Sequence, residues 1–146
     1  MLNTQTVANT FIMLGYKENI LITPMKLQKL VYLLYKRYLQ STGCKLFEEP
    51  FCKWKYGPVV PSIYYEFKDF KSAPITKFAR NAQNGAEMID LSRYSQVQEA
   101  VYDVWNKYKK YSAAELSALT HKAGSAWSRA SITLSDEDIK NEPEFC

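Results

Sequence analysis

The clearest helix signal in the chain is TPMKLQKLVYLLYKRYLQSTG, residues 23–43. Thr23 can cap the helix, and Pro24 suits the first helical position because an amide proton there would have no intrahelical partner. Gly43 is a typical C-terminal stop. One face carries apolar side chains at helical spacing, namely Leu27, Leu30, Val31, Leu34 and Tyr38. The basic side chains fall elsewhere around the helix, at Lys26, Lys29, Lys36 and Arg37. We therefore expect residues 24–42 to form the central core helix.

Helical patterns continue on both sides of this segment. They cover residues 4–14, ended by Gly15; about 61–70, opened by Pro61; two helices opened by Ser95 and Ser112; a turn near 126–130; and a last turn begun by 135–138. Ser95-x-x-Gln98 and Ser112-x-x-Glu115 both fit the capping box, in which two side chains satisfy each other's backbone amides. Both serine positions are therefore predicted helix caps.

A period-two pattern interrupts the helices. Residues 51–56 place Cys52, Trp54 and Tyr56 on one side of a short strand, which Gly57-Pro58 ends. Residues 87–91 predict a second short strand that could pair with it. The sum is a mainly α (α+β) single domain over residues 1–146, with five to six helices and a minor hairpin-like β element.

Composition excludes several classes of protein. The chain is 47% hydrophobic and 23% charged, as in an ordinary globular domain. Its N-terminus lacks the pattern of a signal peptide, and no apolar run is long enough to span a membrane, so we expect a cytoplasmic protein. One histidine and three cysteines without a Cys-x-x-Cys motif argue against a metal site or a disulfide framework.

Charge is distributed unevenly between the two halves. Residues 1–71 hold ten Lys/Arg and five Asp/Glu, and residues 72–146 hold nine and ten. A positive half can contact nucleic acid or an acidic protein. Because the lysines are scattered along the chain, a solvated surface is favoured over a nucleic-acid footprint.

No motif in the chain predicts catalysis. His121 is the only histidine, and Cys44 and Cys52 lie in no recognisable nucleophile motif. The chain has no glycine-rich phosphate loop. We predict a protein that is not an enzyme, with no cofactor, in which His121 ties down the end of a helix. A hydrolase that uses His121 is the alternative.

Aromatic residues beside loops are the candidate partner-binding groups. Trp54 and Trp127 both neighbour predicted loops, and tryptophan is enriched where binding energy is concentrated. Tyr64 and Tyr65 lie on the predicted helix at 61–70. We expect these four residues to take part in binding a partner.

Three motifs carry a family resemblance. They are residues 23–32, residues 54–61 (WKYGPVVP), and residues 112–121 (SAAELSALTH) followed by Trp127. In this order they resemble the three motifs of the Panacea domain family of SocA- and GepA-like bacterial and phage proteins. The resemblance spans about residues 4–140. It implies that the shared motif residues hold the fold, namely Leu27, Lys29, Leu30, Tyr32, Trp54, Gly57, Pro58, Val59, Leu116, Thr120, His121 and Trp127.

The family resemblance also implies a function. It implies an antitoxin of a toxin–antitoxin system that neutralises a cognate toxin by direct protein–protein binding. One branch of the family delivers its toxin to a Clp-type protease, but the sequence ends at Phe145-Cys146 with little room for a degradation tail, so we do not expect that role. The alternative is a phage or mobile-element binding module that acts on a host protein, a protease adaptor or a nucleic acid. The toxin, its contact surface and the oligomeric state are left open.

Overall fold

The structure is a computed structural model, and it describes residues 1–144. Its elements are, in chain order, α1 (Thr4–Glu18), α2 (Pro24–Thr42), β1 (Cys52–Trp54), β2 (Gly57–Val59), α3 (Pro61–Phe67), the 3₁₀ helix η1 (Lys68–Phe70), α4 (Ser95–Tyr108), α5 (Ala113–Thr120), α6 (Ala126–Arg129) and α7 (Asp136–Lys140). The predicted fold class, mainly helical with one small β-hairpin, is confirmed. None of these helices is long and apolar enough to cross a membrane.

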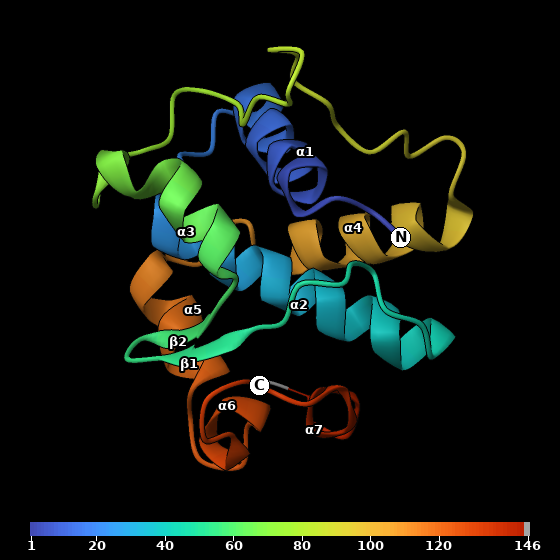
Figure 1. The fold of residues 1–146 in the computed structure, drawn as a ribbon, viewed down its shortest axis with the longest axis vertical. Coiled ribbons are helices and arrows are strands. Elements are labelled where there is room, and N and C mark those ends of the chain that lie inside the picture. Colours follow the sequence, from blue (N-terminus) through green and yellow to red (C-terminus); the bar gives the residue numbers. More distant parts are fainter. Residues whose placement is uncertain (145–146) are drawn as a thin grey trace.

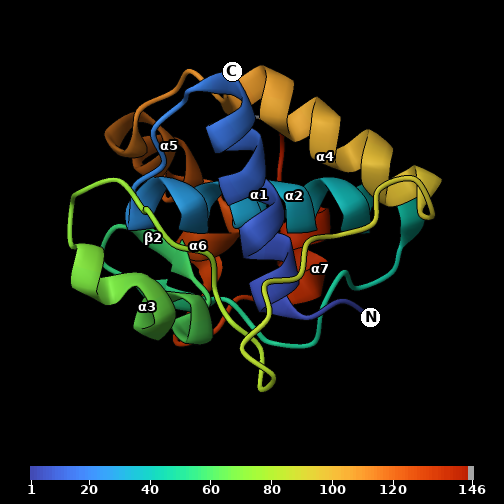
Figure 2. The ribbon, with the colours of Figure 1, turned by 90° about the horizontal axis from the view of Figure 1, so that it is seen from above.

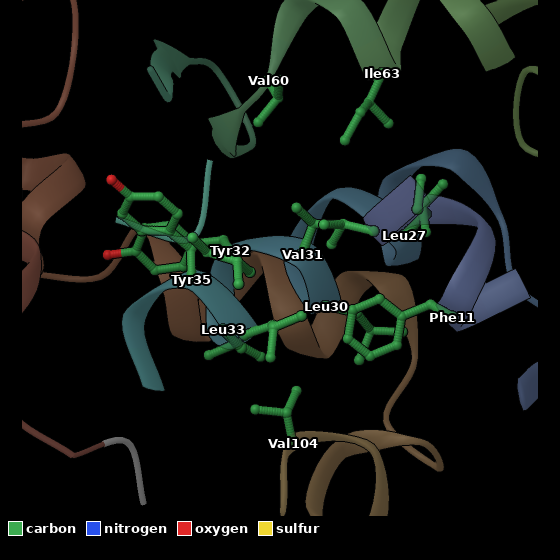
Figure 3. Packing of buried hydrophobic residues seen from close by; sticks show 14 of the residues in the cluster. Phe11, Leu27, Leu30, Val31, Tyr32, Leu33, Tyr35, Val60, Ile63 and Val104 are labelled. Carbon is green, nitrogen blue, oxygen red and sulfur yellow. The ribbon is translucent and has the colours of Figure 1, made fainter. Parts of the chain in front are cut away.

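Helix α2 runs through the middle of the molecule, with the other elements arranged around it (Figures 1 and 2). It contacts α1, α3, α4, α5, α7 and β2. Figure 3 shows its side chains meeting Phe11 of α1, Val104 of α4, and Val60 and Ile63 at the start of α3. The predicted bounds and caps are confirmed: the Thr23 side chain accepts from the Lys26 amide, and Gly43 adopts φ 74°.

The three lysines of α2, Lys26, Lys29 and Lys36, fall outside the predicted apolar stripe, yet all three are buried. Every residue from Lys26 to Lys36 is buried. The buried polar side chains are held by hydrogen bonds to other elements, which makes their burial tolerable. Lys26 donates to the Lys109 carbonyl, and Gln28 exchanges two hydrogen bonds with the Val60 backbone at 3.1 and 3.0 Å. The polar groups of α2 therefore fasten surrounding segments to the central helix.

The strand predicted at residues 87–91 is wrong. Strand β1 pairs antiparallel with β2, in the register Cys52↔Val59 and Trp54↔Gly57. Gly57, expected to end the strand, adopts φ 120° and begins the second strand instead. Residues 85–90 are irregular and dock on α1, where the Ile89 amide donates to the Thr10 hydroxyl at 2.9 Å.

Two predicted helix ends differ from the observed ones. Helix α1 continues past Gly15 to Glu18 and ends at Asn19, which has φ 56°. Gly15 therefore lies inside the helix. A Cβ there would approach the Ile20 carbonyl oxygen to 2.8 Å, so the close approach of the following loop favours glycine at this position. At the start of α4, Ser95 is already helical and Tyr94 occupies the cap position without a side-chain hydrogen bond.

The capping box at Ser112 is confirmed. Its hydroxyl accepts from the Glu115 amide at 3.1 Å, and the Glu115 carboxylate accepts from the Ser112 amide at 2.9 Å. Hydrogen bonding from Ser112, foremost from its backbone amide, lowers the pKa of the Glu115 carboxyl. The reciprocal pair of bonds fixes the first turn of α5. Helix α5 packs against α2 and β2.

The segment after α6 closes the far side of the domain. Its backbone joins the free edge of β1, where the Lys53 amide donates to the Ile132 carbonyl at 2.8 Å and the Leu134 amide donates to the Phe51 carbonyl at 2.9 Å. Further on, the buried Glu142 carboxylate lies 3.0 Å from the Lys36 ammonium. This segment therefore protects the hairpin edge and is anchored to α2.

The structure describes two of the three cysteines. Cys44 and Cys52 are both unpaired. Cys146 lies outside the described residues.

Candidate partner-binding site

A groove of about 390 Å³ opens between the N-terminal part of α2, the β-hairpin and α3. We call it the hairpin groove. It is lined by Pro24, Met25, Gln28, Lys29, Trp54, Lys55, Tyr56, Val59, Ile63, Tyr64 and Lys71. These residues are mostly apolar or aromatic, with three lysines and no acidic side chain. Such a surface suits an apolar group that carries negative charge.

Aromatic rings form one wall of the hairpin groove. Trp54 of β1 meets Tyr64 of α3 edge-to-face, with ring centroids 4.8 Å apart, and Tyr65 meets Tyr64 at 5.4 Å. Tyr64 is 40% exposed and Tyr65 63% exposed. The fold therefore brings three of the four predicted partner-binding residues together, and two of them line the groove.

Trp127 lies apart from the groove lining. Its indole N–H donates to the Trp54 carbonyl at 2.7 Å, and the Lys53 ammonium lies 4.6 Å from the centroid of its ring. The His121 ring meets it at 5.2 Å. Trp127 therefore holds α6 against the strand that carries Trp54, and it positions the groove without lining it.

His121 contacts backbone and aromatic groups. It occupies the C-terminal cap of α5, and its Nδ1 meets the Ser117 carbonyl of the preceding turn. The Ser117 hydroxyl in turn donates to the Tyr56 carbonyl in the hairpin turn. This arrangement connects α5 to the hairpin and matches the helix-end role expected for His121. Among the described residues, no three His, Cys, Asp or Glu side chains gather to hold a metal ion.

Lys29 lies against the underside of the hairpin. Its ammonium donates to the Pro58 carbonyl at 2.9 Å, and a Cβ on Gly57 would come within 3.1 Å of its Nζ. The side chain is 1% exposed, and burial lowers the pKa of this amine to about 7. None of the ion pairs formed within residues 1–144 includes Lys29.

The place of Lys29 in a groove was not predicted from the sequence, where it counted only as a structural motif residue. The signal that points to its burial is the run of residues 27–35, in which apolar side chains extend around more than one face. A helix that is apolar nearly all round is buried, and polar residues within it must find partners inside the protein.

The remaining motif residues form the hairpin or the packed core next to the groove. Gly57, Pro58 and Val59 form β2, and Leu27, Leu30, Tyr32, Leu116 and Thr120 are buried beneath it or farther along α2. The Thr120 hydroxyl donates to the Leu116 carbonyl at 2.8 Å and lies 3.0 Å from the position of a Cβ on Gly57. Close packing of α5 and α2 against Gly57 therefore fixes how closely the hairpin approaches these two helices.

The fold and the groove define a small helical domain with an aromatic-lined groove beside a buried lysine. The chain belongs to the family described as antitoxin SocA-like, Panacea domain, whose sequence model matches residues 27–128. Over 128 residues it is 29% identical to Antitoxin SocA of Caulobacter vibrioides (strain NA1000 / CB15N), covering 86% of this chain and 68% of that protein. No solved structure matches the chain. The resemblance predicted from the three motifs is thereby confirmed.

Proposed function

We propose that this protein is the antitoxin of a toxin–antitoxin system and neutralises its toxin in the cytoplasm by direct binding. The observation that carries the proposal is the membership of the Panacea domain family, together with the similarity to Antitoxin SocA.

The hairpin groove supplies a surface suited to this role. Exposed tyrosines and a half-buried tryptophan are typical anchors of protein–protein interfaces, because they bury large areas with little loss of rotamer freedom. Trp54 and Tyr64 already contact each other, so the wall they form is ordered before a partner arrives. We expect the toxin to cover this wall and the neighbouring Tyr65.

Charge placement favours a protein partner over nucleic acid. Lys26, Lys29 and Lys36 account for three of the ten basic residues in the positive half of the chain, and all three are buried. Lys26 and Lys36 add nothing to a surface that could track phosphates by counterion release, and Lys29 belongs only to the lining of the hairpin groove. The net charge of residues 1–71 therefore overstates the basic surface of that half.

Co-expression tests the proposal. The gene next to this one is expressed from an inducible promoter, alone and together with this chain. We expect growth arrest from the neighbour alone, rescue by this chain, and a complex of the two proteins on size-exclusion chromatography. A harmless neighbour, or arrest that persists beside this chain, would refute the antitoxin function. Rescue that requires the host Clp protease would instead point to an adaptor.

A further inference from the structure

We propose that the hairpin groove binds a segment of the toxin in which an apolar side chain stands next to a carboxylate, and that this carboxylate pairs with Lys29. The inference rests on the proposed antitoxin function and names the chemistry of its contact. The apolar side chain would lie against Trp54 and Tyr64, and the Asp or Glu carboxylate would reach the ammonium beneath the hairpin.

No carboxylate within residues 1–144 forms an ion pair with Lys29. A buried ammonium is expensive unless a carboxylate and further hydrogen bonds surround it. Lys29 has one hydrogen bond, to the neutral Pro58 carbonyl, and no ion pair within residues 1–144. A carboxylate brought by a partner would supply the group that is missing.

The charged side chains that line the groove are all positive. Lys29, Lys55 and Lys71 all belong to the lining, and no lining residue is acidic. Opposite charge across an interface raises the association rate and rejects partners of the wrong charge. An acidic segment is therefore the complementary occupant.

The walls of the groove are mostly apolar. Met25, Val59, Ile63 and the rings of Trp54 and Tyr64 form most of the lining. In a carboxylate carried on an apolar stem, the stem can pack against these walls while the carboxylate pairs with the Lys29 ammonium. A phosphodiester backbone would offer the walls little apolar surface, and the lining holds no arginine to grip it by two hydrogen bonds.

The proposed contact makes binding depend on the protonation of the Lys29 amine. In the free protein the pKa of Lys29 is lowered to about 7, and a carboxylate at 3 to 4 Å would raise it again. Binding would then draw in a proton above pH 7 and weaken as the pH rises. The other titratable groups of the groove lining are Lys55 and Tyr56 in the hairpin, Tyr64 on α3 and Lys71 after η1. On α5, His121 reaches the hairpin turn through Ser117.

The test uses a small probe and the purified full chain. The probe is 4-phenylbutyrate, and its matched neutral control is 4-phenylbutanol. Binding is followed by the NMR shift of the Trp54 indole N–H. At about pH 6 we expect the acid to bind at least about tenfold more tightly than the alcohol, a preference that falls by about tenfold for each pH unit above 7.

Three variants locate the effect. Lys29→Met should bind acid and alcohol equally, and Lys110→Met, an exposed lysine outside the groove lining, should behave as the unsubstituted chain. His121→Gln should leave the pH profile unchanged. The pH series on the unsubstituted chain needs no variant, so it holds even if Lys29→Met fails to fold.

Each remaining outcome overturns part of the inference. Equal binding of acid and alcohol, or no binding of either, refutes the carboxylate site. Tighter binding of a short oligothymidylate, weakening steeply with salt, makes the occupant a nucleic acid. If Lys29→Met loses the acid preference and still rescues growth in co-expression, the toxin does not use this site. The probe assay requires no toxin, so its failure is distinguishable from failure of the antitoxin function.

Discussion

Two buried lysines of α2, Lys29 and Lys36, lie about two helical turns apart and are treated differently by the fold. The Lys36 ammonium lies 3.0 Å from the Glu142 carboxylate and donates to the Pro143 carbonyl at 2.9 Å. The Lys29 ammonium meets the neutral Pro58 carbonyl. The chain thus supplies the counter-charge at one end of the helix, whereas within residues 1–144 no carboxylate is paired with Lys29 at the other.

The difference separates a lysine held in an ion-pair network from one whose counter-charge, in our proposal, comes from a partner. Glu142 also accepts hydrogen bonds from the Tyr32 hydroxyl at 3.0 Å and the Ala126 amide at 2.8 Å, so it joins α2, α6 and the C-terminal segment. Burial is the main cause that raises the pKa of Tyr32, and the Glu142 charge adds to it. Around Lys29 the structure offers an aromatic groove in place of such a network.

The largest expected effect comes from removing the carboxylate at the Lys36 end. Glu142→Ala leaves the Lys36 ammonium, the Tyr32 hydroxyl and the Ala126 amide without a shared acceptor. Breaking a buried ion pair from one side destabilises a protein by about 3–5 kcal/mol. Urea denaturation should show this loss in the free energy of unfolding. Glu137→Gln, an exposed change in α7, should alter it by less than about 0.5 kcal/mol; equal effects of the two would contradict the comparison.

Gly57→Ala should have the next largest effect, because it disturbs the Lys29 end directly. The residue has φ 120°, and its Cβ would meet Lys29 Nζ at 3.1 Å and the Thr120 hydroxyl at 3.0 Å. We expect a loss of about 1–3 kcal/mol. Gly124→Ala is the matched control, since Gly124 also has positive φ, 86°, but its Cβ would meet nothing within 4 Å. A smaller loss at Gly124 isolates the contact; equal losses would leave backbone strain as the whole cause.

Lys29→Met should change stability least, and the change should depend on pH. At pH 7 we expect the free energy of unfolding to stay within about 1 kcal/mol, because a lost hydrogen bond is offset by removal of a poorly solvated amine. The folded pKa of Lys29, about 7, lies below the ordinary lysine value of 10.5, so unfolding takes up a proton between these two pH values. Stability contributed by Lys29 therefore rises with pH across this window.

The measurement is the difference in unfolding free energy between Lys29→Met and the unsubstituted chain at pH 7, 8 and 9. The unfolding free energy of Lys29→Met, relative to that of the unsubstituted chain, should fall by about 1 kcal/mol per pH unit. The window stops below the range in which unfolded tyrosines ionise, since the pKa values of buried Tyr32 and Tyr35 are raised in the folded state. A difference that does not vary with pH would mean that Lys29 titrates normally in the fold.

Local signals in the sequence were enough to predict several elements. The bounds of α2 follow from Thr23, Pro24 and Gly43, which all act within one turn of the helix ends. The capping box at Ser112 forms, but the same spacing at Ser95 does not, because Tyr94 takes the cap position there. A local motif permits a cap, and the path of the preceding chain determines whether it is used.

Contacts between distant residues could not be predicted in the same way. The partner of β1 is β2, three residues on, because the tight turn at Lys55-Tyr56 permits the hairpin while residues 87–91 are held by α1. Lys36 is buried because Glu142, more than a hundred residues later, comes to meet it. Trp54 and Tyr64 were named from the sequence as partner-binding candidates, and both line the groove. The place of Lys29 in that lining depends on the three-dimensional path of the hairpin.

The pKa of the Lys29 amine tests the central claim most directly. It can be followed by the ¹³Cε shift in the full chain, assigned with Lys29→Met, with and without 4-phenylbutyrate. The account predicts a pKa near 7 in the free protein, raised by at least one unit when the carboxylate binds. A free value near 10.5, or a depressed value that the acid leaves unchanged, would contradict it.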